Sequence, residues 1–97
     1  MRFEWDKHKA VSNFKKHKIN FETAITVFDD PYALIAPDEK HSTSKEKREW
    51  IIGESDNGIL VVVFTKRIQG AIYRIISARR ANKKERRLYE EYKKFPL

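Results

Sequence analysis

The chain has 97 residues, contains no cysteine and carries a formal net charge of +7. A chain of this length is expected to form a single domain over residues 1–97, because two cores of half this size would not be stable. The lack of cysteine excludes a disulfide framework, a thiolate nucleophile and a thiolate metal site, which suits a reducing, cytoplasmic location. No apolar run approaches the about 18 residues of a membrane span, and the N-terminal MRFEWDK lacks a signal-peptide pattern.

The N-terminal segment predicts a short strand followed by a helix. Polar and apolar side chains alternate over residues 2–5, as they do in a half-buried strand. Asp6 offers an N-cap for a helix over residues 7–17, because its carboxylate can accept from a free backbone N–H of the first turn. The apolar side chains of this helix, Val11 and Phe14, are expected to face the core.

A second, shorter helix is predicted after Asn20, which is another N-cap candidate. The apolar side chains that follow are spaced i, i+3, i+4 and i+7, the stripe of one helix face, and are Phe21, Ala24, Ile25 and Phe28. Pro31 ends this helix, because the residue before a proline is disfavoured in the α region.

Four strands are predicted in the middle of the chain, at residues 32–36, 49–54, 59–65 and 71–78. The polar, charged segment 38–47 between the first two is expected to be a loop. Asp56-Asn57-Gly58 predicts a tight hairpin, and a second turn is expected near Gln69-Gly70. Residues 59–65 are apolar on both alternating faces, which indicates a central strand that is covered on both sides.

The last helix is predicted to begin at Asn82, with Glu85 three residues on in the arrangement of a capping box. Its apolar stripe is expected to consist of Leu88, Tyr92 and Phe95. The element order β-α-α-β-β-β-β-α predicts an α+β fold, in which a mainly antiparallel sheet packs against two N-terminal helices and a basic C-terminal helix.

The positive charge is concentrated in the C-terminal part of the chain. Residues 59–97 carry eleven lysines and arginines against three acidic residues, whereas residues 29–58 carry four against eight. Five arginines are spread across the predicted strand–helix junction, at Arg74, Arg79, Arg80, Arg86 and Arg87. Because a guanidinium binds phosphate in a bidentate manner, this unit indicates RNA or another phosphate-rich partner. A basic surface that only keeps the protein soluble is the alternative.

Three segments resemble one known family. They are the opening FEWDKHKAVSNFKKHKINFETAITVFDDP, the His41 loop after Pro37-Asp38, and the closing RIISARRANKKERRLYEEY. Together they resemble the BrnT toxins of bacterial type II toxin–antitoxin systems, over nearly the whole chain and in the expected order. Lys18 departs from the pattern, since family members commonly have a glycine at this turn.

The resemblance implies a RelE-like ribonuclease fold and an RNA-cleaving activity that arrests translation. It also implies neutralisation by a small cognate antitoxin, BrnA, and binding of operator DNA only through the toxin–antitoxin complex. Composition and periodicity agree with this family but do not establish these properties by themselves.

Cleavage of RNA without a metal needs a base for the 2′-hydroxyl, cations for the charge that develops at phosphorus, and an acid for the leaving oxygen. No His and carboxylate cluster has metal-ligand spacing, because His8 and His17 are nine residues apart and His41 is distant from both. Neither a metal nor a cofactor is therefore expected.

Arg74 is the leading catalytic candidate because it interrupts an apolar strand, where an unpaired charge is costly. It either contacts phosphate or forms an ion pair with one of three acidic residues, Glu54, Asp29 or Asp30. In a regular strand its face would be shared with Ile72, Ile76 and Ala78. Regular alternation places Ser77 and Arg79 on the opposite face and returns Arg80 to the side of Arg74.

Arg79 and Arg80 are expected to hold the scissile phosphate together with Arg74. His41 is a candidate for proton transfer, because histidine titrates near neutrality, and a solvated loop histidine is the alternative. Tyr89 is expected to stack on a base or donate a proton, unless it packs beside Tyr92.

Further basic residues are expected to contact RNA along its backbone: Lys15, Lys16, His17, Lys66, Arg67, Lys83, Lys84, Arg86 and Arg87. For His17 the alternative is a charge that complements the helix dipole, and for the last helix it is a solvated face with i,i+4 pairs. Trp5 and Trp50 are expected to be core anchors. The function predicted is a metal-independent endoribonuclease toxin, and the alternative is a non-catalytic nucleic-acid-binding co-regulator that acts with a partner protein.

Overall fold

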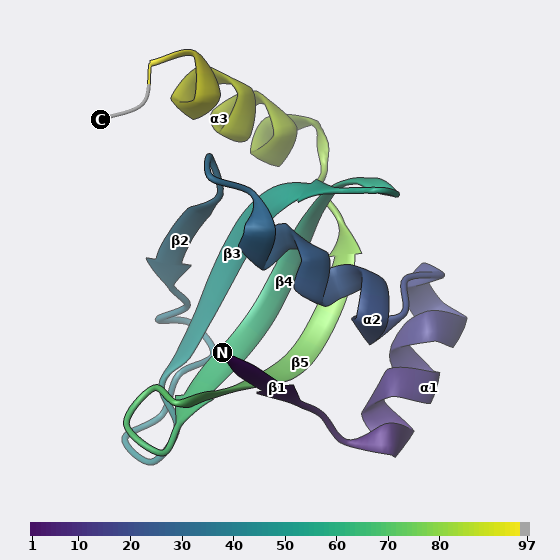
Figure 1. The fold of residues 1–97 in the computed structure, drawn as a ribbon, viewed down its shortest axis with the longest axis vertical. Helices are drawn as coiled ribbons and strands as arrows, with labels where there is room; N and C mark the ends of the chain where they lie inside the picture. The colour runs from purple at the N-terminus through teal and green to yellow at the C-terminus, as the bar shows by residue number, and fades with distance from the viewer. Residues whose placement is uncertain (96–97) are drawn as a thin grey trace.

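The computed structural model describes residues 1–95, which form a five-stranded mixed sheet and three α-helices. In chain order the elements are β1 (Arg2–Glu4), α1 (Lys7–His17), α2 (Phe21–Ala24), the 3-10 helix η1 (Ile25–Asp29), β2 (Leu34–Pro37), β3 (Arg48–Ser55), β4 (Gly58–Arg67), β5 (Ile72–Arg80) and α3 (Lys83–Lys94). The strands lie in the order β1-β5-β4-β3-β2 (Figure 1). Among the described strands β1 alone runs parallel to its neighbour, β5. The predicted α+β class and element order are confirmed.

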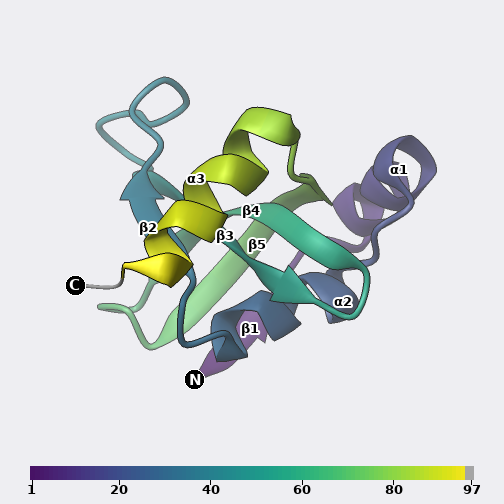
Figure 2. The ribbon, with the colours of Figure 1, turned by 90° about the horizontal axis from the view of Figure 1, so that it is seen from above.

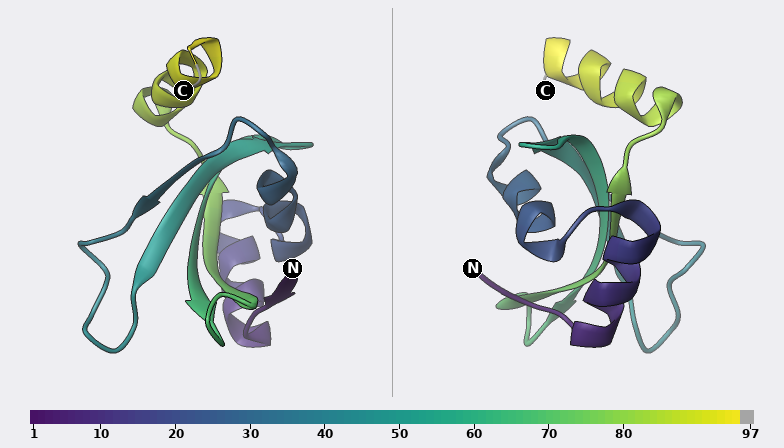
Figure 3. Two further views of the ribbon diagram at one scale, coloured as in Figure 1. Left: turned by 60° about the vertical axis from the view of Figure 1, so that its left-hand side comes forward. Right: turned by 90° about the vertical axis from the view of Figure 1, so that its right-hand side faces the viewer.

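The central strand β4 is covered on both faces, as its unbroken apolar sequence predicts. Val62 and Phe64 belong to the core under α1 and α2, whereas Val61 packs in a second cluster with Tyr89 of α3. Figures 2 and 3 show α3 on one side of the sheet and α2 on the other. The two N-terminal helices therefore cover the face that holds the main core, while α3 covers only one end of the opposite face.

The three predicted N-caps are confirmed. The side chains of Asp6, Asn20 and Asn82 accept hydrogen bonds from the first turns of α1, α2 and α3. At α3 the capping box is complete, because the Glu85 carboxylate accepts in return from the backbone N–H of Asn82 at 2.9 Å. This return contact places Glu85 at the start of α3, next to the end of β5.

The predicted inward face of α1 is wrong. Val11 and Phe14 are exposed, and the buried side chain of this helix is Asn13. The Asn13 amide donates to the carbonyls of Ile19 at 3.0 Å and Ala78 at 2.8 Å, and its oxygen accepts from the Ala78 N–H at 3.0 Å. A polar side chain faces inward here because it satisfies backbone groups that β5 leaves free where β1 has ended.

The predicted apolar stripe of α3 is wrong at two of its three positions, since only Tyr92 is partly buried. Leu88 and Phe95 are exposed, at 51% and 76%, whereas Tyr89 is 1% exposed. The Tyr89 ring packs with Ile52 and Val61, and its hydroxyl donates to the Asp30 carboxylate. Docking of α3 therefore depends on one amphipathic side chain that has both an apolar and a polar partner.

A β-bulge interrupts the alternation of β5. The register between β4 and β5 shifts between Val63 and Phe64, which pair with Ser77 and Ile75, so that Ile76 is the extra residue. Ile75 and Ala78 both belong to the core under α1 and α2. The prediction that Arg74 shares a face with Ala78 is consequently wrong, because the bulge inverts the faces beyond it.

Candidate active site

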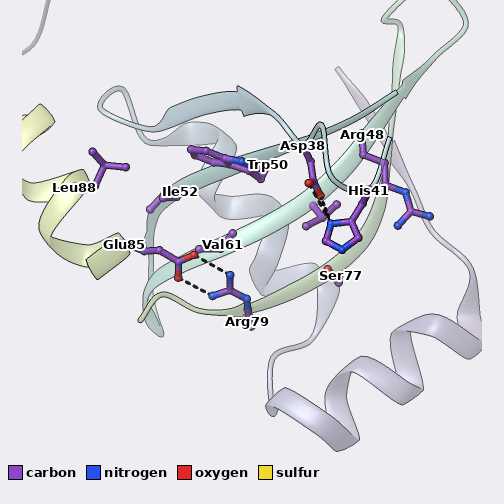
Figure 4. Close-up of a pocket in the computed structure, with 11 residues that line it drawn as sticks. Asp38, His41, Arg48, Trp50, Ile52, Val61, Ser77, Arg79, Glu85 and Leu88 are labelled. Carbon is purple, nitrogen blue, oxygen red and sulfur yellow. Dashed lines mark hydrogen bonds and ion pairs between the residues drawn. The ribbon is translucent and has the colours of Figure 1, made fainter. Parts of the chain in front are cut away.

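A cavity of about 450 Å³ lies on the sheet face that α1 and α2 leave uncovered. Strands β3, β4 and β5 form its floor, the loop 38–47 bounds one side, and α3 bounds the other (Figure 4). The residues that line it are Asp38, His41, Arg48, Trp50, Ile52, Val61, Val63, Ser77, Arg79, Glu85 and Leu88. The cavity thus joins an apolar floor to a rim that bears two arginines, a histidine and two carboxylates.

Arg79 is held by a bidentate ion pair at the α3 side of the cavity. Its two terminal nitrogens donate to the two Glu85 oxygens at 2.7 and 2.8 Å. These hydrogen bonds raise the pKa of Arg79 and lower the pKa of Glu85, and they outweigh partial burial, which shifts both pKa values the other way. Arg79 therefore stays charged, in a fixed orientation, and uses only part of its five N–H donors on Glu85.

His41 and Asp38 form a pair at the loop side of the cavity. The Nδ1 atom of His41 lies 3.0 and 3.1 Å from the two Asp38 oxygens. Asp38 is 13% exposed, whereas His41 is 58% exposed. A carboxylate on Nδ1 favours the tautomer with the proton on that nitrogen, which leaves Nε2 as an acceptor on a side chain that is more than half exposed.

The loop that carries this pair is fastened to β3 by Ser42. The Ser42 hydroxyl donates to the Asp38 carbonyl at 2.7 Å and accepts from the Arg48 N–H at 2.8 Å. The side chain of Arg48, which also lines the cavity, pairs with Glu46 through Nε at 2.8 Å. These contacts tie the loop 38–47, predicted as a polar and charged segment, to the start of β3 and thereby position Asp38 and His41.

The three arginines expected to act together are not brought together. Arg74 pairs with Glu4 of β1 at 2.8 Å, outside the cavity, and none of the three expected acidic partners is involved. Arg80 is exposed, and its guanidinium approaches the His17 carbonyl at 3.4 Å. The prediction that Arg80 rather than Arg79 shares the face of Arg74 is wrong, because the bulge at Ile76 returns Arg79 to that face. Arg74 is separated from Arg79 by its distance along the strand and does not line the cavity.

Tyr89 packs against Ile52 and Val61 in the second apolar cluster but does not itself line the cavity. Burial, followed by the hydrogen bond to Asp30, raises the pKa of Tyr89 well above its ordinary value. A buried hydroxyl whose proton is committed to a carboxylate has no access to RNA. The expectation that it stacks on a base or donates a proton is not supported by this geometry.

A shallower groove of about 230 Å³ adjoins the cavity and shares Ser77 with it. Lys16 and His17 of α1, two predicted RNA contacts, line this groove. Burial, followed by the charges of Lys16 and Arg79, lowers the pKa of His17. The lowered pKa favours the neutral imidazole, which argues against a role for His17 as a cation at the end of α1.

The other predicted RNA contacts are dispersed over the surface. Lys15, Lys83, Lys84 and Arg87 are exposed on the helices. Arg86 donates to the carbonyl of Ala81, at the base of α3. Lys66 pairs with Glu49 and Arg67 lies 3.7 Å from Glu4, in a separate hollow at the far end of the sheet.

The family of the chain follows from a match that covers most of it. The family described as "Ribonuclease toxin, BrnT, of type II toxin-antitoxin system" matches residues 5–85. The chain belongs to the BrnT family. No curated protein matches it significantly. The matched span contains every residue that lines the cavity except Leu88, so the cavity is part of the domain that defines the BrnT family.

Several residues of this BrnT-family cavity are not found by reasoning from the sequence: Asp38, Arg48, Trp50, Ser77, Glu85 and Leu88. The capping box was a signal for the position of Glu85, although not for its pairing with Arg79. Trp50 was expected to be a core anchor, and its ring does pack on the second apolar cluster while it also lines the cavity. Trp5 is a core anchor as expected, packed edge-on against Phe21.

Two further observations concern residues 1–95. No group of three or more His, Asp and Glu side chains in this range is arranged to hold a metal ion. Within the same range no helix is both long and apolar enough to cross a membrane.

Proposed function

We propose that this BrnT-family chain is an endoribonuclease that cleaves RNA in the cavity without a metal ion, arrests translation, and is neutralised by a cognate BrnA-like antitoxin. The observation that supports this most directly is that the His41–Asp38 pair and the Arg79 guanidinium line one cavity. A general base and a fixed cation are the two groups that cleavage at a ribose 2′-hydroxyl needs most.

In this proposal His41 acts as the base. Asp38 accepts a hydrogen bond from the Nδ1–H group, and Nε2 removes the proton of the 2′-hydroxyl. The 2′-oxygen forms a bond to the adjacent phosphorus, and the bond from phosphorus to the 5′-oxygen breaks. The products are a 2′,3′-cyclic phosphate and a 5′-hydroxyl, whose proton comes from water.

The two arginines of the cavity stabilise the negative charge that builds on the phosphoryl oxygens. Arg79 is oriented by Glu85 before RNA arrives, and Arg48 is oriented by Glu46. Because these cations are already fixed, little reorganisation is needed when the charge develops. Arg74 and Arg80 contribute to the general positive potential but are not placed at the phosphate.

The test is incubation of the purified protein with RNA in excess EDTA. The wild-type protein is expected to produce fragments with cyclic phosphate ends. Arg79→Ala and His41→Ala are each expected to lower the rate by about a hundredfold or more. Arg2→Ala removes an exposed arginine of β1 and serves as the matched control, with an unchanged rate.

Three outcomes would contradict parts of this proposal. Intact RNA under all conditions rejects the enzyme, and salt-dependent binding without cleavage supports the co-regulator instead. Cleavage that requires a divalent ion rejects only the metal-free mechanism. A wild-type rate for His41→Ala rejects His41 as the base.

A further inference from the structure

The apolar part of the cavity has no role in holding a phosphate. Five of its lining side chains are apolar: Trp50, Ile52, Val61, Val63 and Leu88. Phosphate gains nothing from such a surface, and a space of about 450 Å³ exceeds what a phosphate group needs. The substrate must therefore place a second, less polar group beside the phosphate.

Trp50 is the largest of these side chains and has a favourable position for a flat ligand. It lies on β3, between Ala36 of β2 and Val63 of β4 in the register of the sheet. Both neighbours are small, so neither fills the space above the sheet beside the indole. The indole rests on the second apolar cluster, which fixes its orientation.

The polar groups near Trp50 are suited to the edge of a base. In Figure 4 the indole is seen between the Asp38 side of the cavity and Leu88. Asp38, Ser77 and Glu85 offer oxygen atoms that can accept from the N–H groups of a base, and Arg48 and Arg79 lie on the same rim. An aromatic floor with a polar border and adjacent cations is how proteins bind unstacked bases of single-stranded RNA.

We propose that the cavity seats one unstacked nucleobase of RNA on the indole of Trp50, next to the phosphate held by Arg79. This inference rests on the proposed ribonuclease function and adds to it the position that recognises the substrate. The seat takes single-stranded RNA, because a base within a duplex is stacked on its neighbours and cannot enter. Trp50 is a substrate-binding residue in this proposal, and His41 remains the base.

The first experiment detects the seat without any cleavage. The chain contains two tryptophans, so Trp5→Phe leaves Trp50 as the only indole. Adenosine 5′-monophosphate is expected to quench its fluorescence in a saturable manner. Ribose 5-phosphate, which has the same phosphate and sugar but no base, is expected to leave the fluorescence unchanged. Equal quenching by the two compounds, or none by either, overturns the proposal.

The second experiment follows cleavage of a short RNA and of the same RNA with one abasic position next to the scissile bond. Stacking of one base contributes about ten- to a hundredfold to binding, so the wild-type protein should show a KM higher by that factor on the abasic RNA. Trp50→Ala should raise the KM on normal RNA to a similar extent and no longer distinguish the two RNAs. Trp50→Phe should retain most of the discrimination.

Ile35→Ala is the matched control, because Ile35 is an exposed apolar residue of β2 that does not line the cavity. Its KM values should equal those of the wild type. Unchanged KM and discrimination in Trp50→Ala overturn the base seat while the nuclease stands. Quenching by adenosine 5′-monophosphate in a protein that cleaves no RNA supports the seat and rejects the nuclease.

Discussion

The arginines of β5 show how strongly the surroundings of a residue determine what it can do. Arg74 and Arg79 are both paired with a glutamate, but Glu4 lies on β1 outside the cavity, whereas Glu85 lies at its rim. Arg80 has no carboxylate partner among the described residues and faces α1. Identical side chains within seven positions therefore have three different environments, which composition alone could not distinguish.

Tyr89 provides a prediction at the residue scale. Tyr89→Phe keeps the ring in the apolar cluster but removes the hydroxyl that donates to Asp30. Loss of a buried hydrogen bond to a charged acceptor should lower the free energy of unfolding by about 1–3 kcal/mol, measured by urea denaturation. Tyr32→Phe, which removes the hydroxyl of an exposed tyrosine, is the control and should have little effect.

The same variant should alter the response to acid. Burial alone would raise the pKa of Asp30, but hydrogen bonds from Tyr89 and from the N–H groups of Glu54 and Tyr32 hold this pKa below its usual value. A carboxyl with a lowered pKa in the folded state stabilises the protein above about pH 4 and loses that contribution as the pH falls through the folded-state pKa. Tyr89→Phe should therefore lose less stability than the wild type between about pH 5 and pH 2, measured by urea denaturation at a series of pH values. An equal loss in the two proteins would contradict the role of this contact.

At the scale of elements, the sequence predicted the helix caps correctly but not which helix faces pack against the sheet. The caps at Asp6, Asn20 and Asn82 were predictable because each depends on a bond between near neighbours in sequence. The inward faces of α1 and α3 were not, because Asn13 and Tyr89 are buried through partners 65 and 59 residues away. The bulge in β5 could not be predicted either, because it is defined by the pairing of β5 with β4 and leaves no mark in the sequence of β5 alone.

Lys18 offers a prediction at this scale. It follows α1 in the left-handed conformation, with a φ of 60°, and its N–H donates to the Phe14 carbonyl. A side chain in this conformation costs about 1–2 kcal/mol, which glycine avoids. The freer unfolded chain of glycine offsets about half of that gain. Lys18→Gly should raise the free energy of unfolding by about 0.5–1 kcal/mol in urea denaturation. Lys15→Gly, within the helix, should instead destabilise by about 1 kcal/mol.

At the scale of the whole molecule, the two faces of the sheet have different tasks. One face is covered by α1, α2 and η1 and holds the main core. The other is left partly open between α3 and the loop 38–47, and there the cavity forms. The Ser77 groove extends the cavity toward α1, so that a basic track from Arg79 to Lys16 follows the edge of β5.

This track predicts the salt dependence of RNA binding. Each phosphate neutralised by a single-stranded RNA ligand contributes about −0.7 to the slope of log affinity against log salt. Lys16→Ala should weaken binding and reduce the magnitude of this slope by about 0.7, measured by filter binding over a salt series. Lys7→Ala removes an exposed lysine at the other end of α1 and should change the slope less. Equal slopes for both variants would exclude the groove as part of the RNA path.

The amino-acid sequence by itself determined the order of the elements, their caps, the buried central strand and the BrnT-family membership, because these depend on neighbouring residues and on periodicity. Only the tertiary structure decided that Arg79 lines the cavity, that Tyr89 holds α3 against the sheet, and that Trp50 lines the same cavity as the His41–Asp38 pair. The physical reason is that these outcomes depend on strand register and on pairs of side chains distant in sequence. A single bulge at Ile76 was enough to place Arg79, and not Arg80, on the face of the sheet that carries Arg74 and the cavity.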